Sequence, residues 1–160
     1  MAMDWSTLVP VVIGGVLAVG GGALGQALTH TFTASREAKK ARAERLERLA
    51  TAVWAHSTWL DEKMNDVIFR GVEHVGPDPL DEARMLGSLY FPELGTQIAA
   101  VMHARMPMIK FIGQQGVDRR ASPQTWTDSL SERMKEYHAL YETHLDAVHG
   151  FTSACRKTFK

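Results

Sequence analysis

Hydrophobic residues are distributed differently at the start of the chain and over the rest of it. Residues 8–28, LVPVVIGGVLAVGGGALGQAL, contain no charged side chain, and the uncharged region around them covers residues 5–35. An α-helix rises about 1.5 Å per residue, so about 20 residues cross the roughly 30 Å hydrocarbon core of a bilayer. The pattern therefore predicts a transmembrane helix over residues 8–32.

This stretch has two alternative interpretations. The first is a cleaved signal peptide, because residues 25–27 resemble a small-x-small cleavage site; signal peptides begin with positive residues, however, and residues 1–7 carry only Asp4. The second is a dinucleotide-binding turn, because Gly20, Gly22 and Gly25 spell G-x-G-x-x-G. That motif requires a second strand with an acidic residue about 20 residues later, and the sequence there is typical of a charged helix.

Small residues recur along the predicted span at the spacing of a helix face. Gly14, Ala18, Gly22 and Gln26 follow one another at intervals of four, and Gly21 and Gly25 form a second row. Membrane helices use such rows for close approach of their backbones, and a glutamine can hydrogen-bond across the interface. The rows predict a helix-packing face and a homo-oligomer. The alternative is a glycine-rich membrane helix without a defined partner.

The charges that flank the span predict its orientation. All Lys and Arg residues lie at or after position 36, and the membrane-proximal basic cluster consists of Arg36, Lys39, Lys40, Arg42, Arg45 and Arg48. Because basic residues stay on the cytoplasmic side, residues 1–7 form a short extracytoplasmic terminus and the carboxy terminus is cytoplasmic, as in a single-pass protein of the bacterial inner membrane. The cluster is also expected to contact anionic lipid headgroups. A solvated helix face is the simpler reading of it.

The rest of the chain has the hydrophobic period of helices. A seven-residue pattern, typical of a coiled-coil or bundle seam, runs through Leu46, Ala50, Val53, Ser57, Leu60, Met64, Val67 and Gly71. Asp78 and Pro79 are a favourable N-cap and first helical residue, and they predict a short helix over residues 79–89.

Later boundaries are predicted from proline, glycine and polar runs. A third helix has the apolar positions Leu94, Ile98, Val101, Met102, Met106, Ile109 and Ile112, with Arg105 among them. Pro107 should kink it or end it early. Residues 113–124 are expected to be a polar loop. Ser122, within it, is expected to cap a last helix that ends near residues 150–152. The prediction is an all-α fold with an antiparallel cytoplasmic helical bundle at residues 36–155 and a basic tail at 156–160.

Composition and motifs restrict the chemistry. The net charge of zero gives no bulk attraction to nucleic acid, and a single cysteine excludes an intramolecular disulfide. Cys155, with Arg156 and Lys157 beside it, is expected to be a bystander thiol near a frayed helix end. The E-x-x-H and H-E-x-x-H metal motifs are absent, so His138, His144 and His149 are expected on a partly exposed helix surface. No catalytic residue, cofactor site or metal site is predicted, and the protein is not expected to be an enzyme.

Two functional hypotheses follow from these features. The first is a membrane-anchored interaction or scaffold protein that self-associates through its glycine-rich helix and presents its helical domain to a cytoplasmic protein partner. The second is a membrane-active effector, holin-like or toxin-like, whose glycine-rich helices assemble in the bilayer and permeabilise it.

Overall fold

A computed structural model describes the backbone of residues 5–158 and the surroundings of the side chains of residues 33–158. Within that part of the chain, all regular secondary structure is helical. The elements are α1 (Trp5–Met64), the π-helical turn η1 (Asn65–Arg70), α2 (Pro79–Tyr90), the 3-10 turn η2 (Pro92–Leu94), α3 (Gly95–Ala121), α4 (Pro123–Asp128) and α5 (Leu130–Thr158).

The chain divides into two compact units, residues 1–42 and residues 43–160. The first contains residues 5–42 of α1, and the second, called the helical domain here, contains all later helices. Among residues 33–158, no helix is both long enough and apolar enough to cross a membrane. The predicted transmembrane helix at residues 8–32 lies outside the residues whose side chains the structure describes.

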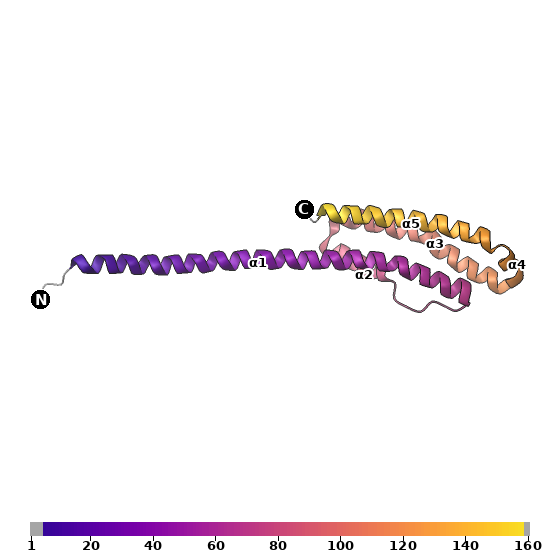
Figure 1. The fold of residues 1–160 in the computed structure, drawn as a ribbon, viewed down its shortest axis with the longest axis horizontal. Helices are drawn as coiled ribbons and strands as arrows, with labels where there is room; N and C mark the ends of the chain where they lie inside the picture. Colours follow the sequence, from indigo (N-terminus) through magenta and orange to yellow (C-terminus); the bar gives the residue numbers. More distant parts are fainter. Residues whose placement is uncertain (1–4, 159–160) are drawn as a thin grey trace. The chain divides into compact units, whose positions relative to one another are not determined.

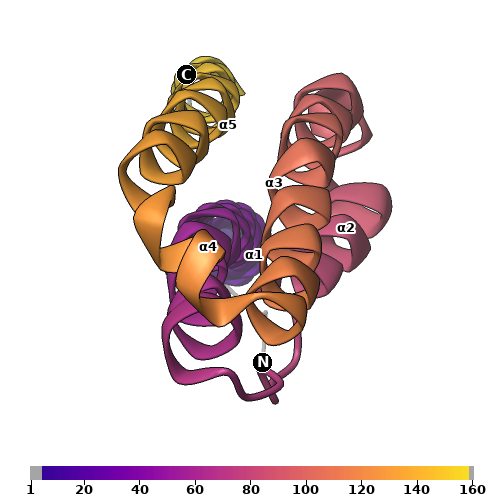
Figure 2. The same cartoon turned by 90° about the vertical axis from the view of Figure 1, so that its right-hand side faces the viewer.

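The helical domain is a bundle in which α3 and α5 form an antiparallel pair joined by the short α4 (Figure 1). Seen end-on, α5 and α3 flank the part of α1 that belongs to the helical domain, residues 43–64, and α2 lies next to α3 (Figure 2). Gly71 ends η1 with a φ of 72°, a left-handed conformation that favours glycine. The loop that follows, residues 71–78, returns the chain to α2. The bundle of the prediction is therefore confirmed.

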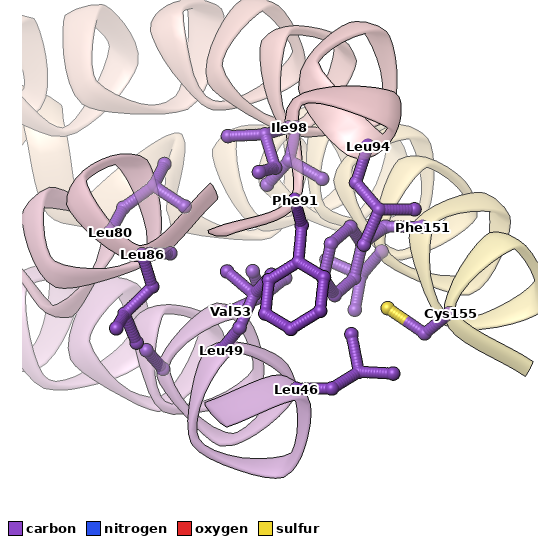
Figure 3. Packing of buried hydrophobic residues seen from close by; sticks show 14 residues of the cluster. Leu46, Leu49, Val53, Leu80, Leu86, Phe91, Leu94, Ile98, Phe151 and Cys155 are labelled. Carbon is purple, nitrogen blue, oxygen red and sulfur yellow. The ribbon is translucent and has the colours of Figure 1, made fainter. Parts of the chain in front are cut away.

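Two apolar clusters form the core of this domain. The first apolar cluster, shown in Figure 3, comprises Leu46, Leu49, Ala52, Val53, Leu80, Ala83, Leu86, Phe91, Leu94, Ile98, Val101, Val148, Phe151 and Cys155. The second apolar cluster comprises Leu60, Met64, Ile68, Met108, Phe111, Ile112, Trp126 and Tyr137. Each large side chain that is fully buried contributes about 1.5–3 kcal/mol, and these contacts hold the helices together.

Local signals predicted several boundaries correctly. The side chain of Asp78 accepts a hydrogen bond of 2.9 Å from the backbone N–H of Leu80 and so caps α2, with Pro79 as its first residue. Phe91, with a φ of −139°, interrupts the helical path between α2 and η2, and its ring is fully buried in the first apolar cluster. Most of the seven-residue seam is buried as well: Ala50 and Val67 are half-buried, and Gly71 is an exposed cap.

The predicted polar loop at residues 113–124 is wrong, because α3 continues through Ala121. Its polar side chains bind within the fold: the amide oxygen of Gln115 accepts a hydrogen bond of 3.0 Å from the indole N–H of Trp126. Arg119 donates to the carbonyl of Ile68 in η1. These residues are polar because they pair with other elements, and the turn is confined to Ser122.

Pro107 is predicted to kink its helix or end it early, and the last helix is predicted to end near residues 150–152. Helix α3 does not end at Pro107, because Met108, Phe111 and Ile112 are buried just beyond it. Their packing outweighs the roughly 3 kcal/mol that an interior proline costs. Helix α5 likewise runs past Gly150 to Thr158, since Phe151 and Cys155 pack into the first apolar cluster.

Candidate functional site: a polar layer and an adjoining pocket

A polar layer crosses the interior of the helical domain. We define it as His56, Ser57, Asp78, Arg105 and His144. On α1, His56 and Ser57 lie between residues of the two apolar clusters, as does Arg105 on α3 and His144 on α5. The layer therefore separates the first apolar cluster from the second along three helices.

Asp78 is the centre of the layer on the side of α2. One of its carboxylate oxygens lies 2.7 Å from Nδ1 of His56 and also caps α2, while the other accepts a hydrogen bond from Arg105. Burial alone raises the pKa of Asp78, but hydrogen bonds from His56 and Leu80 and the charges of His56 and Arg105 outweigh it and lower the pKa to about 2. Asp78 is therefore an anion at neutral pH that connects three helices.

His144 occupies the other side of the layer, on α5. Its Nε2 lies 3.1 Å from the hydroxyl oxygen of Ser57, and its ring meets that of His56 edge-on, with 5.5 Å between centroids. Burial lowers the pKa of His144 to about 4, and the charges of His56 and Arg105 act in the same direction, against Asp61. His144 is therefore neutral at pH 7. Its Nδ1 has no hydrogen-bond partner among the residues whose side chains the structure describes.

The Ser57–His144 pair has the atoms of a nucleophile and a base, but neither side chain is accessible to a substrate. Ser57 is 4% exposed and His144 is fully buried, so a substrate cannot reach either side chain in this conformation. A third group that would orient His144 through Nδ1 is also lacking. Among the described residues, no group of three or more His, Cys, Asp and Glu side chains is arranged to hold a metal ion. The hydrogen bonds of the layer join α1, α3, α5 and the start of α2, and this geometry suits a structural role.

Aromatic rings continue from this layer toward the surface. His56 stacks on Trp59 with 5.4 Å between ring centroids, and Trp59 meets His74 edge-on at the same distance. Nδ1 of His74 lies 2.8 Å from a carboxylate oxygen of Asp66, which fixes the orientation of the imidazole. Trp59 and His74 then line an open pocket of about 410 Å³ together with Ala55, Thr58, Glu62, Val75, Gly76, Pro77 and Pro79.

A second polar contact ties α5 to α1 next to the layer. The hydroxyl groups of Tyr137 and Tyr141 donate to the two carboxylate oxygens of Asp61, at 2.6 Å and 3.1 Å. Burial raises the pKa of Tyr137, and the hydrogen bond to Asp61 and its charge raise it further, so Tyr137 stays protonated. This contact stabilises the α1–α5 pairing.

The site residues predicted from the sequence form two groups. The helix-packing face, Gly14, Ala18, Gly21, Gly22, Gly25 and Gln26, lies outside the residues whose side chains are described. All six members of the basic cluster are exposed. In the helical domain, however, Arg45 lies over the ring of Tyr90 at 4.3 Å and Arg48 forms an ion pair with Glu82, so these two cations also hold α2.

Cys155 differs from its prediction. Helix α5 does not fray there, and the thiol lies in the first apolar cluster. Burial raises the pKa of Cys155 to about 11, in spite of the neighbouring Arg156 and Lys157. The thiol is therefore a packing group, protonated at neutral pH.

The prediction that His144 lies on a partly exposed surface is wrong, and His56 was not predicted as a core residue. The helical spacing of the apolar residues indicates that both histidines face the core. His144 belongs to the row Tyr137, Tyr141, His144 and Val148, and His56 lies three residues after Val53. His138 and His149 are exposed, as predicted. Comparisons of the chain with protein-family models, curated proteins and solved structures give no match.

Proposed function

We propose that this protein is a single-pass membrane protein that self-associates through its transmembrane helix and presents its helical domain to a cytoplasmic protein partner. The observation that carries the proposal is the uncharged stretch at residues 5–35, followed at once by the basic cluster. Such a stretch has the length of a bilayer span, and the charge that follows it orients the span with the amino terminus outside. The expected membrane is the bacterial inner membrane.

The organisation of the helical domain supports a binding role. Residues 43–158 have two apolar clusters of their own, and a unit with its own core can act as a separate binding module. Helix α2 also carries a candidate contact surface. Met85 is 50% exposed and Leu89 is 63% exposed, and their i, i+4 spacing places them on one helix face. Adjacent exposed apolar side chains of this kind favour contact with a protein.

The basic cluster supports a contact with lipid. Arg36, Lys39, Lys40 and Arg42 are exposed in the first unit. Anionic headgroups attract each Lys or Arg near a membrane surface with about 1 kcal/mol. Arg45 and Arg48 contact Tyr90 and Glu82 of α2, so we expect these contacts to compete with lipid for the two cations.

Extraction and protease accessibility test the anchor and its orientation. The full chain should stay in the membrane pellet in alkaline carbonate, and a protease added outside intact cells should leave residues 36–160 uncut. Val16→Arg should release a large fraction of the chain, because a charge at the centre of a span costs about 2.5–3.5 kcal/mol, whereas Val16→Leu should behave like the parent. Extraction of the parent chain by carbonate, or digestion of residues 36–160 from outside, would contradict the proposal.

Substitutions on the small-residue face test self-association. Gly22→Leu or Ala18→Leu should reduce the oligomer size while the chain remains in the membrane, because leucine prevents close approach of backbones but favours the bilayer. Val16→Leu is the control. The measurement is the subunit number in detergent, for the full chain and for residues 1–35 fused to a monomeric reporter. Unchanged oligomers for both leucine variants in both contexts would exclude this face as the interface.

The glycine-rich stretch also favours a second candidate, the membrane-active effector. Leakage of dye from liposomes that contain the full chain separates the two functions. A scaffold leaves the liposomes sealed, whereas an effector releases the dye. If leakage occurs and Gly22→Leu abolishes it, assembly of these helices permeabilises the bilayer, and the effector replaces the scaffold as the function.

A further inference from the structure

Two buried nitrogen atoms without a hydrogen-bond partner in the protein meet at the pocket beside Trp59. They are Nε1 of Trp59 and Nε2 of His74, and the absence of a partner refers to residues 33–158. Both side chains line the open pocket of about 410 Å³, and the side chain of His74 is only 7% exposed. A buried polar atom without a partner is unfavourable, so this pair distinguishes the pocket from an ordinary surface depression.

Gly76 shows that the two nitrogens face one small volume. A Cβ atom placed on Gly76 would lie 3.6 Å from Nε2 of His74 and 4.0 Å from Nε1 of Trp59. Apart from the two chain neighbours of Gly76, no other atom of the described residues lies within 4 Å of it. Both nitrogens therefore lie within 4.0 Å of one point beside the Cα atom of Gly76, and all three residues line the pocket. The glycine leaves open a cradle that any larger residue would fill.

The chemistry of the two nitrogens is complementary. Trp59 Nε1 is a donor only. The ionised carboxylate of Asp66 accepts from Nδ1 of His74, because the pKa of Asp66 is lowered, first by its hydrogen bond with His74. The proton of a neutral His74 is thus on Nδ1, and Nε2 is left as an acceptor. The cradle presents one donor and one acceptor side by side.

The remaining walls of the pocket are mostly apolar and include one carboxylate. Ala55, Val75, Pro77 and Pro79 contribute apolar surface, and Glu62 lines the same pocket. Asp66 lies behind His74, and Lys63 lies over the ring of Trp59, 4.9 Å from its centroid. An anion would meet the carboxylate of Glu62, whereas a neutral group with one acceptor and one donor fits both nitrogens without repulsion.

We propose that this pocket binds a neutral carboxamide, whose carbonyl oxygen accepts from Nε1 of Trp59 and whose N–H donates to Nε2 of His74. The side chain of Asn or Gln carries this group. Its assignment to a residue of the protein partner rests on the proposed function, but the carboxamide site itself does not.

Titration of the full chain with acetamide tests the site. The chain is labelled with ¹⁵N in its Trp and His rings, in detergent if it requires one, and the Nε1–H resonance of Trp59 is assigned as the one lost in Trp59→Phe. Acetamide should shift this resonance and that of His74 Nε2 in a saturable manner. The indole N–H of Trp126, which is bonded to Gln115, serves as the internal reference and should not move.

Probes and variants then decide between the carboxamide and other ligands. Acetone lacks the donor and acetate is an anion, so both should give weaker shifts than acetamide. Gly76→Ala should abolish the saturable shift, because its methyl group fills the cradle at ordinary contact distances and leaves the fold intact, whereas Gly113→Ala, with open space around it, should bind like the parent.

Several outcomes would overturn the site. These are a shift that rises linearly without saturation, an equal response of Trp126, equal binding by Gly76→Ala, or acetate binding as tightly as acetamide. None of these depends on the membrane anchor. Conversely, a chain that carbonate extracts from membranes would refute the anchor but leave the acetamide result intact.

Discussion

The first apolar cluster and the polar layer use neighbouring turns of the same helices in different ways. Leu49, Val53 and Phe151 are fully buried by contacts that are short-ranged and without strong direction. One helical turn away, His56 pairs with Asp78 and Ser57 with His144, and these contacts require particular atoms to face one another. Apolar packing brings the helices together, and we expect the polar layer to select the register in which they meet.

The comparison also shows where the domain is vulnerable. An apolar cluster loses stability in proportion to the volume and surface that a substitution removes. A buried charged group depends on its partner, because loss of the partner leaves the charge uncompensated. The two regions should therefore respond differently to substitution and to pH, and the following experiments compare them.

The largest effect is expected for Leu60→Asp in the second apolar cluster. Leu60 is fully buried, and an unpaired charge there costs several kcal/mol, against a total domain stability of about 5–15 kcal/mol. The helical domain should unfold, as seen by loss of its near-ultraviolet circular dichroism. Leu60→Met is the control and should cost less than about 1.5 kcal/mol. A folded Leu60→Asp domain would show that the second cluster is not a packed core.

The next effect concerns the charges of the polar layer. Arg105→Leu removes a cation that binds Asp78, and we expect a loss of about 3 kcal/mol in urea unfolding, because the Asp78 carboxylate keeps only His56 and the Leu80 N–H. Adding Asp78→Asn should restore part of that loss, since the amide oxygen still caps α2 without a charge. If the losses of stability from Arg105→Leu and Asp78→Asn add up in the double variant, Arg105 and Asp78 are not coupled.

The pH dependence should also distinguish the layer from the clusters. His144 has a pKa of about 4 in the folded protein and about 6.5 when unfolded. The unfolded chain therefore binds more protons between these values, and stability should fall as the pH is lowered from about 6.5 to 4, by about 3 kcal/mol at most. Asp78, with a folded pKa of about 2, should add a further loss only below about pH 4.

His144→Leu is the variant that separates the two titrations. It should flatten the free energy of unfolding between pH 6.5 and pH 4 and leave the loss at lower pH unchanged. Its Ser57 hydroxyl can still bond to a carbonyl of α1, so the variant should fold. If urea unfolding of His144→Leu retains the slope of the parent across this window, another group carries the pH dependence.

The smallest effects are expected for glycines of α3, which supports both regions. Gly113 is exposed with open space around it, so Gly113→Ala should stabilise the domain by about 0.5–1 kcal/mol. An added Cβ on Gly116 would instead lie 2.5 Å from Cγ1 of Val67, a stiff β-branched side chain, so Gly116→Ala should destabilise it by about 1–3 kcal/mol. Thermal unfolding of both variants provides the measurement, and shifts of the same sign would contradict this packing.

The sequence alone was sufficient where the physical signal is local. The Asp78–Pro79 pair predicts the start of α2 because a cap and a proline act within one turn, and the seam from Leu46 to Met64 predicts the buried face of α1 because helical periodicity is a property of one segment. The uncharged stretch at residues 5–35 is a signal of the same local kind, and its membrane role stays a prediction.

Contacts between segments far apart in the chain were decided only by the tertiary structure. Residues 113–121 are polar enough to resemble a loop, yet they are helical because Gln115 and Arg119 find partners on other elements. The polar layer joins residues separated by 22 to 87 positions, and the cradle at Gly76 depends on a loop returning to Trp59. Hydrophobic period shows which face of a helix is buried, but only the packed fold determines which polar atom each buried group meets.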